Sequence, residues 1–231
     1  MTKVLIDGDC RLADVISAYP NVLLTLERFG ITLGFGEKTI AQVCQRSGVS
    51  TSFFLLICNV QAFDDYVPSR ATMNSTDMSG LVDYLMRSHS YYLGKRLPHI
   101  AGHITRIAQL LPEGHVRESF VAFFNLYRNE VETHFHHEEK HVFPHILRSQ
   151  RGEQHSSYSV DDFISIHGNL QDKLDDLTQI IFKYLPASVT TDDTIDAVFD
   201  ILQLSQDLQK HNVVEEKIMV PYVKHIERQR E

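Results

Sequence analysis

The chain has 231 residues, of which 43% are hydrophobic and 23% charged, a composition typical of a folded globular protein. Its formal net charge of -8 argues against a general nucleic-acid or anionic-membrane binder, because an acidic surface repels phosphate groups. The three cysteines lie far apart without a C-x-x-C pair, which argues against a disulfide framework and a thiolate zinc site and fits a cytoplasmic protein. No apolar run approaches the length of a membrane-spanning helix.

Residues 1–67 predict a small helical domain. Apolar residues recur at helical spacing over 12–30 and again over 40–63, with a turn at Gly48. The stretch 40–54 has the rhythm of a helix-turn-helix, but TSFFLLICNV lacks the polar and basic residues of a recognition helix. We therefore expect this helix to pack rather than to enter a DNA groove, with an exposed face of Phe53, Phe54 and Leu55 that could serve a homodimer.

A change of composition separates this domain from the rest of the chain. Residues 68–79 are rich in Ser, Thr and Asn without apolar periodicity, which predicts a linker. Residues 80–231 then contain four long segments with apolar residues three and four apart, typical of helices in a bundle. Polar residues interrupt each apolar seam: His89 in the first, His134 and Glu138 in the second, His167 in the third, and His211 and Glu215 in the fourth.

The second and fourth segments repeat one pattern at an offset of 77 residues, which places His134 on His211 and Glu138 on Glu215. Residues four apart on a helix share a face, so each His–Glu pair points in one direction. Burying such groups without compensation costs on the order of 1 to 3 kcal/mol each, and more for a carboxylate. Two cations would neutralise the layer, so the pattern predicts a dinuclear site, with iron favoured over manganese or zinc.

The same residues also allow other interpretations. A lone histidine such as His167 is by itself more often a hydrogen-bonded core residue than a ligand. A ferritin-like site would need Glu-x-x-His on two helices, but only Glu138 and His141 show it in these two motifs. A purely structural bundle stays open until the metal content is known. We expect His137, His141 and His145, a stripe near the end of the second helix, to lie at the solvated rim of the bundle. Because His141 and His145 also continue the inward seam, a role beside the metal or in its entry is the alternative. Surface placement is the default for His99, His103, His115, His136, His155 and His225.

The motifs HFHHEEKHVFP and HNVVEEKIMVP resemble those of the hemerythrin-like (HHE) domains, and the two-part layout resembles the repair-of-iron-centres family of di-iron proteins. The resemblance implies an all-α fold, in which a small N-terminal helical domain precedes a hemerythrin-like four-helix bundle. It also implies two iron ions in an oxo- and carboxylate-bridged di-iron centre, with His89, His134, Glu138, His167, His211 and Glu215 as metal ligands. The family often has its first histidine at the position of Ser90, whereas helical periodicity favours His89.

The resemblance also implies a function. We expect a cytoplasmic protein of the nitrosative and oxidative stress response that repairs, or supplies iron to, damaged iron–sulfur clusters. Its expected partners are oxygen, nitric oxide or peroxide and iron–sulfur proteins, with neither nucleic acid nor a membrane. Family members commonly carry adjacent cysteines where this chain has Leu33 and Gly34. That difference favours the alternative, a hemerythrin-like sensor or carrier of oxygen or nitric oxide. Catalytic turnover is left open, and no catalytic residue is predicted.

Overall fold

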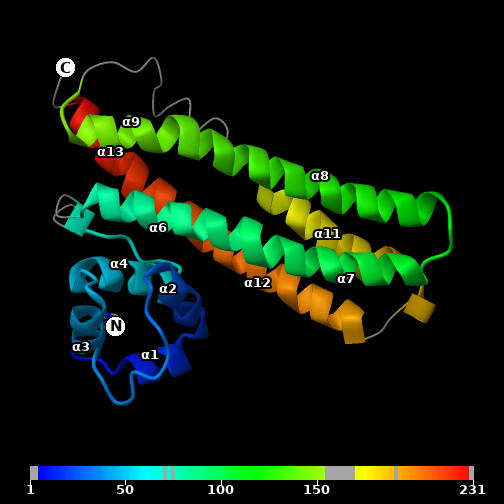
Figure 1. Ribbon diagram of the computed structural model, residues 1–231, viewed down its shortest axis with the longest axis horizontal. Helices are drawn as coiled ribbons and strands as arrows, with labels where there is room; N and C mark the ends of the chain where they lie inside the picture. The colour runs from blue at the N-terminus through cyan, green and yellow to red at the C-terminus, as the bar shows by residue number, and fades with distance from the viewer. Residues whose placement is uncertain (1–4, 70–71, 74–75, 154–169, 190–191, 229–231) are drawn as a thin grey trace. The chain divides into compact units, whose positions relative to one another are not determined.

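The computed structural model describes residues 5–69, 72–73, 76–153, 170–189 and 192–228 (Figure 1). Within these ranges the regular structure is helical, and the sole β feature is an isolated bridge between Arg11 and Thr39. The predicted all-α class is confirmed. The chain divides into two compact units, one made of Met1–Arg87 with Lys210–Glu231 and the other of Ser88–Gln209. The predicted domain boundary at 68–79 stays a prediction.

The N-terminal part of the first unit contains α1 (Leu12–Ala18), α2 (Leu23–Arg28), α3 (Ile40–Ser47) and α4 (Thr51–Ala62) (Figure 1). A capping box between Thr39 and Gln42 starts α3. Gly48 ends it with a φ of 67°, a left-handed conformation that glycine adopts without strain, so the predicted turn is confirmed.

Helix α4 buries most of its length, as its apolar sequence predicted. The expected exposed face is wrong at Phe54, which has no exposed surface and lies 5.0 Å, centroid to centroid, from the ring of Phe29. The physical reason is that successive residues of an α-helix are turned by about 100°, so three in a row do not share one face.

The same unit contains the C-terminal end of α12 (Asp192–Val214), which a buried lysine anchors. Lys210 donates hydrogen bonds from its Nζ to the Val60 carbonyl at 2.9 Å and to Asp64 Oδ1 at 2.7 Å. The first of these bonds ties this end of α12 to α4. His211, a predicted ligand, is the next residue, so its backbone is held in place by its neighbour.

The second unit has one continuous hydrophobic core. Four helices line it: α7 (Leu97–Leu110), α8 (His115–His137), α11 (Leu170–Tyr184) and the first part of α12. In Figure 1 these four helices run side by side, as the predicted bundle requires, and α8 packs against both α7 and α11. Phe120, Phe124, Tyr127 and Val131 recur at spacings of three and four along α8 and are all buried.

Within the part of the chain that the structure describes, three π-helical turns interrupt the long helices. They are η2 (Tyr92–Arg96) between α6 (Met78–Tyr91) and α7, η3 (Glu138–Val142) between α8 and α9 (Phe143–Gln150), and η5 (Glu215–Met219) between α12 and α13 (Val220–Arg228). In each, a backbone N–H donates to the carbonyl five residues earlier: Leu97 to Tyr92, Phe143 to Glu138 and Val220 to Glu215. A proline follows each of these donors, at 98, 144 and 221.

The prolines account for the wide turns. Proline has no N–H to give, and its ring clashes with the carbonyl four residues earlier, so a regular α turn is disfavoured there. A π turn moves that carbonyl away at the cost of one extra residue. Two of the three turns begin at a predicted metal ligand. Among the described residues, no helix has both the length and the hydrophobicity needed to cross a bilayer.

Candidate metal centre

Both H-x-x-x-E motifs lie where a regular helix passes into a π turn. His134 is in the last turn of α8, and Glu138 is the first residue of η3. His211 is in the last turn of α12, and Glu215 is the first residue of η5. The sequence repeat is thus also a repeat of local structure, and π turns are frequent at functional sites.

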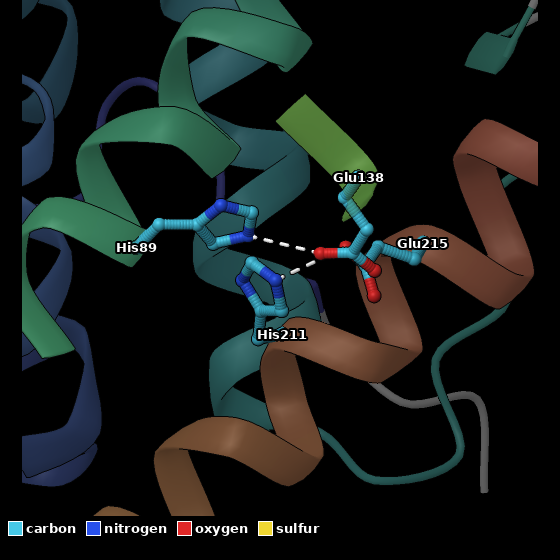
Figure 2. Close-up of side chains that lie close together, drawn as sticks. All are labelled: His89, Glu138, His211 and Glu215. Carbon is cyan, nitrogen blue, oxygen red and sulfur yellow. Dashed lines mark ion pairs between the residues drawn. The ribbon is translucent and has the colours of Figure 1, made fainter. Parts of the chain in front are cut away.

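In the second unit, one carboxylate faces two imidazoles. Glu138 has no exposed side-chain surface, and its Oε2 lies 3.2 Å from Nε2 of His89, which is equally buried (Figure 2). Its other oxygen, Oε1, lies 3.1 Å from Nε2 of His134, whose side chain is 10% exposed. Glu138 therefore presents one oxygen to each ring, as a carboxylate that bridges two sites would.

His89 is held from its far side. Its Nδ1 lies 3.0 Å from Glu139 Oε1. The ring also stacks on Phe135, with centroids 3.9 Å apart and an angle of 9° between the planes, and on Phe143 at 5.5 Å. The structure thus places His89 beside the predicted ligand Glu138. The role of Glu139 was not predicted, because the H-x-x-x-E spacing selects Glu138 as the inward carboxylate and says nothing about contacts of the residue after it.

The first unit contains the matching couple. His211 and Glu215 are both buried, and Nε2 of His211 lies 3.0 Å from Oε1 of Glu215 (Figure 2). The corresponding distance between His134 and Glu138 is 3.1 Å, so the two copies of the motif have nearly the same geometry. His167, the remaining predicted ligand, lies outside the described residues.

These donors fit a metal ion. A carboxylate only accepts hydrogen bonds, so when Nδ1 of a neutral His89 donates to Glu139, Nε2 carries a lone pair that faces Glu138. Two lone pairs 3.2 Å apart in a buried site repel unless a proton or a cation lies between them. Imidazole nitrogen combined with carboxylate oxygen suits iron, manganese or zinc. The chemistry of the buried donors therefore agrees with a cation site.

The neighbouring histidines follow the expected rim placement except at one position. His141 is exposed, as expected, but His145 is buried. The π turn faces His141 outward, because its extra residue shifts the buried positions after Glu138 to Val142 and Phe143. His137 is half-buried. Burial, and next to it the charge of His141, lowers the pKa of His137 below its ordinary value and favours a neutral ring.

The surface placement expected for the remaining histidines is wrong at one of them. His99, His115, His136 and His225 are exposed, but His103 is buried, and His155 lies outside the described residues. His103 faces Asp193 and Asp200 of α12. The spacing of four between His99 and His103 is the sequence signal that could have found this second cluster.

Comparisons with known proteins agree with this picture. The sequence matches the hemerythrin HHE cation-binding domain over residues 95–223, which include both H-x-x-x-E motifs but not His89. It is also 18% identical over 219 residues to the "Iron-sulfur cluster repair protein ScdA" of Staphylococcus haemolyticus (strain JCSC1435), a match that covers 93% of this chain and 98% of that protein. The predicted resemblance and the hemerythrin-like fold are thereby confirmed. The chain belongs to the hemerythrin HHE cation-binding domain family.

Proposed function

We propose that the chain is a non-haem di-iron protein that repairs, or supplies iron to, damaged iron–sulfur clusters under nitrosative and oxidative stress. The observation that carries the proposal is the buried His–Glu couple, which occurs twice with distances of 3.1 and 3.0 Å. The repair role is supported by the name of the staphylococcal relative. A cytoplasmic location is supported by the three free cysteines, which suit a reducing compartment.

Six residues are assigned as the ligands of the two iron ions. They are His89, His134, Glu138, His167, His211 and Glu215. Glu138 supports a bridging role, since its two oxygens face two different imidazoles. Bound iron would supply redox chemistry and exchangeable positions for oxygen, peroxide or nitric oxide. The chain's own contribution is to hold the donors in place: Glu139 orients His89, and Phe135 and Phe143 surround it with apolar surface.

Two single substitutions test the ligand assignment. His134→Ala and Glu215→Ala should each lose at least one iron ion per chain, because each removes a donor, while far-UV circular dichroism keeps most of the helical signal. His136→Ala and Glu216→Ala are matched controls, since both side chains are exposed neighbours of the ligands. The measurement is elemental analysis of anaerobically prepared protein. Iron content equal to the controls in either ligand variant would contradict the assignment.

The repair role needs a separate experiment. Iron-loaded protein is mixed with an iron–sulfur enzyme whose cluster has lost iron, and the activity of that enzyme is followed. Recovery should occur with the unmodified protein and be much weaker with His134→Ala. If the enzyme stays inactive although the added protein keeps its iron, the repair role is wrong while the metal assignment stands.

A second function, a sensor or carrier of oxygen or nitric oxide, is favoured by one observation. The position at which the repair family commonly has its cysteine pair carries Leu33, which is 70% exposed, and Gly34. Thiol chemistry is therefore not available at this position. A reversible optical change on adding oxygen or nitric oxide, without reactivation of the iron-depleted enzyme, would select this function.

A further inference from the structure

The second unit contains another cluster of metal-type donors, outside the six proposed ligands. His99 and His103 lie one turn apart on α7, and Asp200 lies on α12. One donor atom of each residue lies within 4.8 Å of the other two. Along α6 and α7, His99 and His103 are ten and fourteen residues beyond His89, or ~15–21 Å at a helical rise of ~1.5 Å per residue.

One oxygen of Asp200 is the focus of this cluster. Oδ2 of Asp200 lies 3.0 Å from Nε2 of His99 and 3.3 Å from Nε2 of His103. The His103 side chain is only 7% exposed and that of Asp200 19%, whereas His99 is 60% exposed. Two imidazole nitrogens and one carboxylate oxygen thus lie close together. Because the His99 side chain is exposed, a metal ion can reach these three atoms from solvent.

The carboxylate is fixed by an arginine on its other side. Nη2 of Arg96 donates to Asp200 Oδ1 at 3.0 Å and to the Asp200 backbone carbonyl at 3.3 Å. Oδ1 is therefore occupied, and Oδ2 is left turned toward the two histidines. A side chain held in this way loses little further conformational entropy when it becomes a ligand.

His103 also has an orienting carboxylate. Its Nδ1 lies 3.3 Å from Asp193 Oδ1, to which Nε of Arg106 donates at 2.8 Å. The hydrogen bond from Arg106 holds the pKa of Asp193 below its usual value, so this carboxylate stays ionised as an acceptor. When Nδ1–H donates to Asp193, Nε2 carries the lone pair, which is the carboxylate–histidine–metal arrangement.

Arg106 sets up a competing tautomer. Its Nη2 lies 2.8 Å from Nδ1 of His103, and a guanidinium only donates. In this tautomer Nδ1 accepts from Arg106, and Nε2–H donates to Asp200 at 3.3 Å. Binding of a cation at Nε2 requires the proton of His103 to be on Nδ1, where Asp193 accepts it. Asp193 is therefore the acceptor in the metal-binding tautomer, and Asp200 is the acceptor in the other tautomer.

We propose that His99, His103 and Asp200 form a second, mononuclear binding site for a divalent transition metal of the zinc class. Three protein donors of the His₂Asp type with a fourth position open to solvent are what a solvent-accessible zinc site uses. The charges of Arg96 and Arg106 oppose a cation, so we expect weaker, exchangeable binding rather than a structural zinc. This site does not depend on the proposed function, because it shares no residue with the di-iron ligands.

The test is zinc binding by the iron-loaded full chain, measured by competition with a chromophoric chelator. The unmodified protein should bind one more zinc ion per chain than His99→Ala or Asp200→Asn, while all three keep the same iron content and circular dichroism. His115→Ala is the matched control: His115 is an exposed histidine whose Nδ1 lies 3.7 Å from a carboxylate, Glu118, without a second imidazole. It should bind zinc like the unmodified protein.

Asp193→Ala provides a second readout. Because Asp193 orients a ligand without contacting the ion, this variant should keep the stoichiometry but bind zinc about 10- to 100-fold more weakly. X-ray absorption of the bound zinc should show two imidazoles both in the unmodified protein and in this variant. Equal zinc stoichiometry in the unmodified protein and His99→Ala, including no zinc in either, overturns the proposal.

Discussion

His89 shows how much a single proposed ligand position depends on its surroundings. The family often has its histidine one residue later, and the sequence alone offered helical periodicity as the argument for position 89. The structure buries His89 completely, between a carboxylate on each nitrogen: Glu138 at Nε2 and Glu139 at Nδ1. The contact with Glu139 orients the ring so that Nε2 faces the predicted site. A sequence pattern carries no information about this orientation.

Glu139→Ala tests this orienting role. The variant should bind iron about 10- to 100-fold more weakly without losing a ligand, because removal of the acceptor frees the ring and its tautomer. Competition with an iron chelator gives the affinity. Glu139→Gln should recover part of it, since its amide oxygen still accepts from Nδ1, and Glu132→Ala, an exposed site on α8, serves as control. Affinity in Glu139→Ala equal to that control would contradict the role.

For single residues, the sequence predicted burial correctly where a side chain continues the helical spacing of its neighbours. Glu138, His211 and Glu215 were expected inside from their spacing, and all three are buried. His103 was missed although its spacing of four from His99 is visible, because its partners Asp193 and Asp200 lie 90 and 97 residues away on another helix, and local spacing does not show that these carboxylates are near. The burial of His145 was not predicted, because the π turn before it adds a residue that the sequence pattern does not reveal.

At the scale of elements, the π turns are the feature that the sequence pattern did not predict. The prediction of four helices assumes a uniform period of 3.6 residues. In the structure, buried positions are five apart at three places: Tyr92 and Leu97, Glu138 and Phe143, and Glu215 and Val220. Each such step ends directly before a proline. Proline was visible in the sequence, but it can end, bend or widen a helix, and only tertiary packing selects among these outcomes.

Pro221→Ala tests whether the proline maintains its turn. Alanine restores the N–H that a regular α turn needs, and in a helix interior it is favoured over proline by about 3 kcal/mol. We expect the variant to unfold at higher denaturant concentration in the metal-free state but to retain less iron, because Glu215 begins this turn. Iron content and chemical denaturation measure the two effects.

Pro112→Ala is the control for this substitution, since Pro112 lies in the connection between α7 and α8. It should change neither the iron content nor the helical register. If Pro221→Ala keeps the same iron content as Pro112→Ala, the π turn is maintained by packing alone and the assigned role of the proline is wrong.

At the scale of the whole molecule, the proposed ligands come from segments far apart in the chain. His89 and His211 are separated by 122 residues, and the unfolded chain has no preformed arrangement of these donors. An ion that binds only the native state adds its binding free energy to stability, about 2.7 kcal/mol when its free concentration is 100 times Kd. The fold and the metal are therefore thermodynamically linked.

Removal of iron should for this reason lower the thermal midpoint of unfolding. Anaerobic chelation followed by a calorimetric scan measures the shift, and adding ferrous iron back should restore the midpoint. His134→Ala, which is expected to hold less iron, should show a smaller shift on chelation. An unmodified protein whose midpoint is the same with and without iron would contradict the linkage.

The wide turn at Glu138–Val142 also bears on what the loss of one residue would do to this helix. Deleting a single residue there would bring Glu138 and Phe143 to a spacing of four, at which two residues of an ordinary α-helix share a face. Ile146 would then stay on its buried side, whereas the same deletion within the regular turns of α8 would rotate everything that follows by about 100°. This short stretch should therefore withstand a shortening by one residue better than the helix on its N-terminal side.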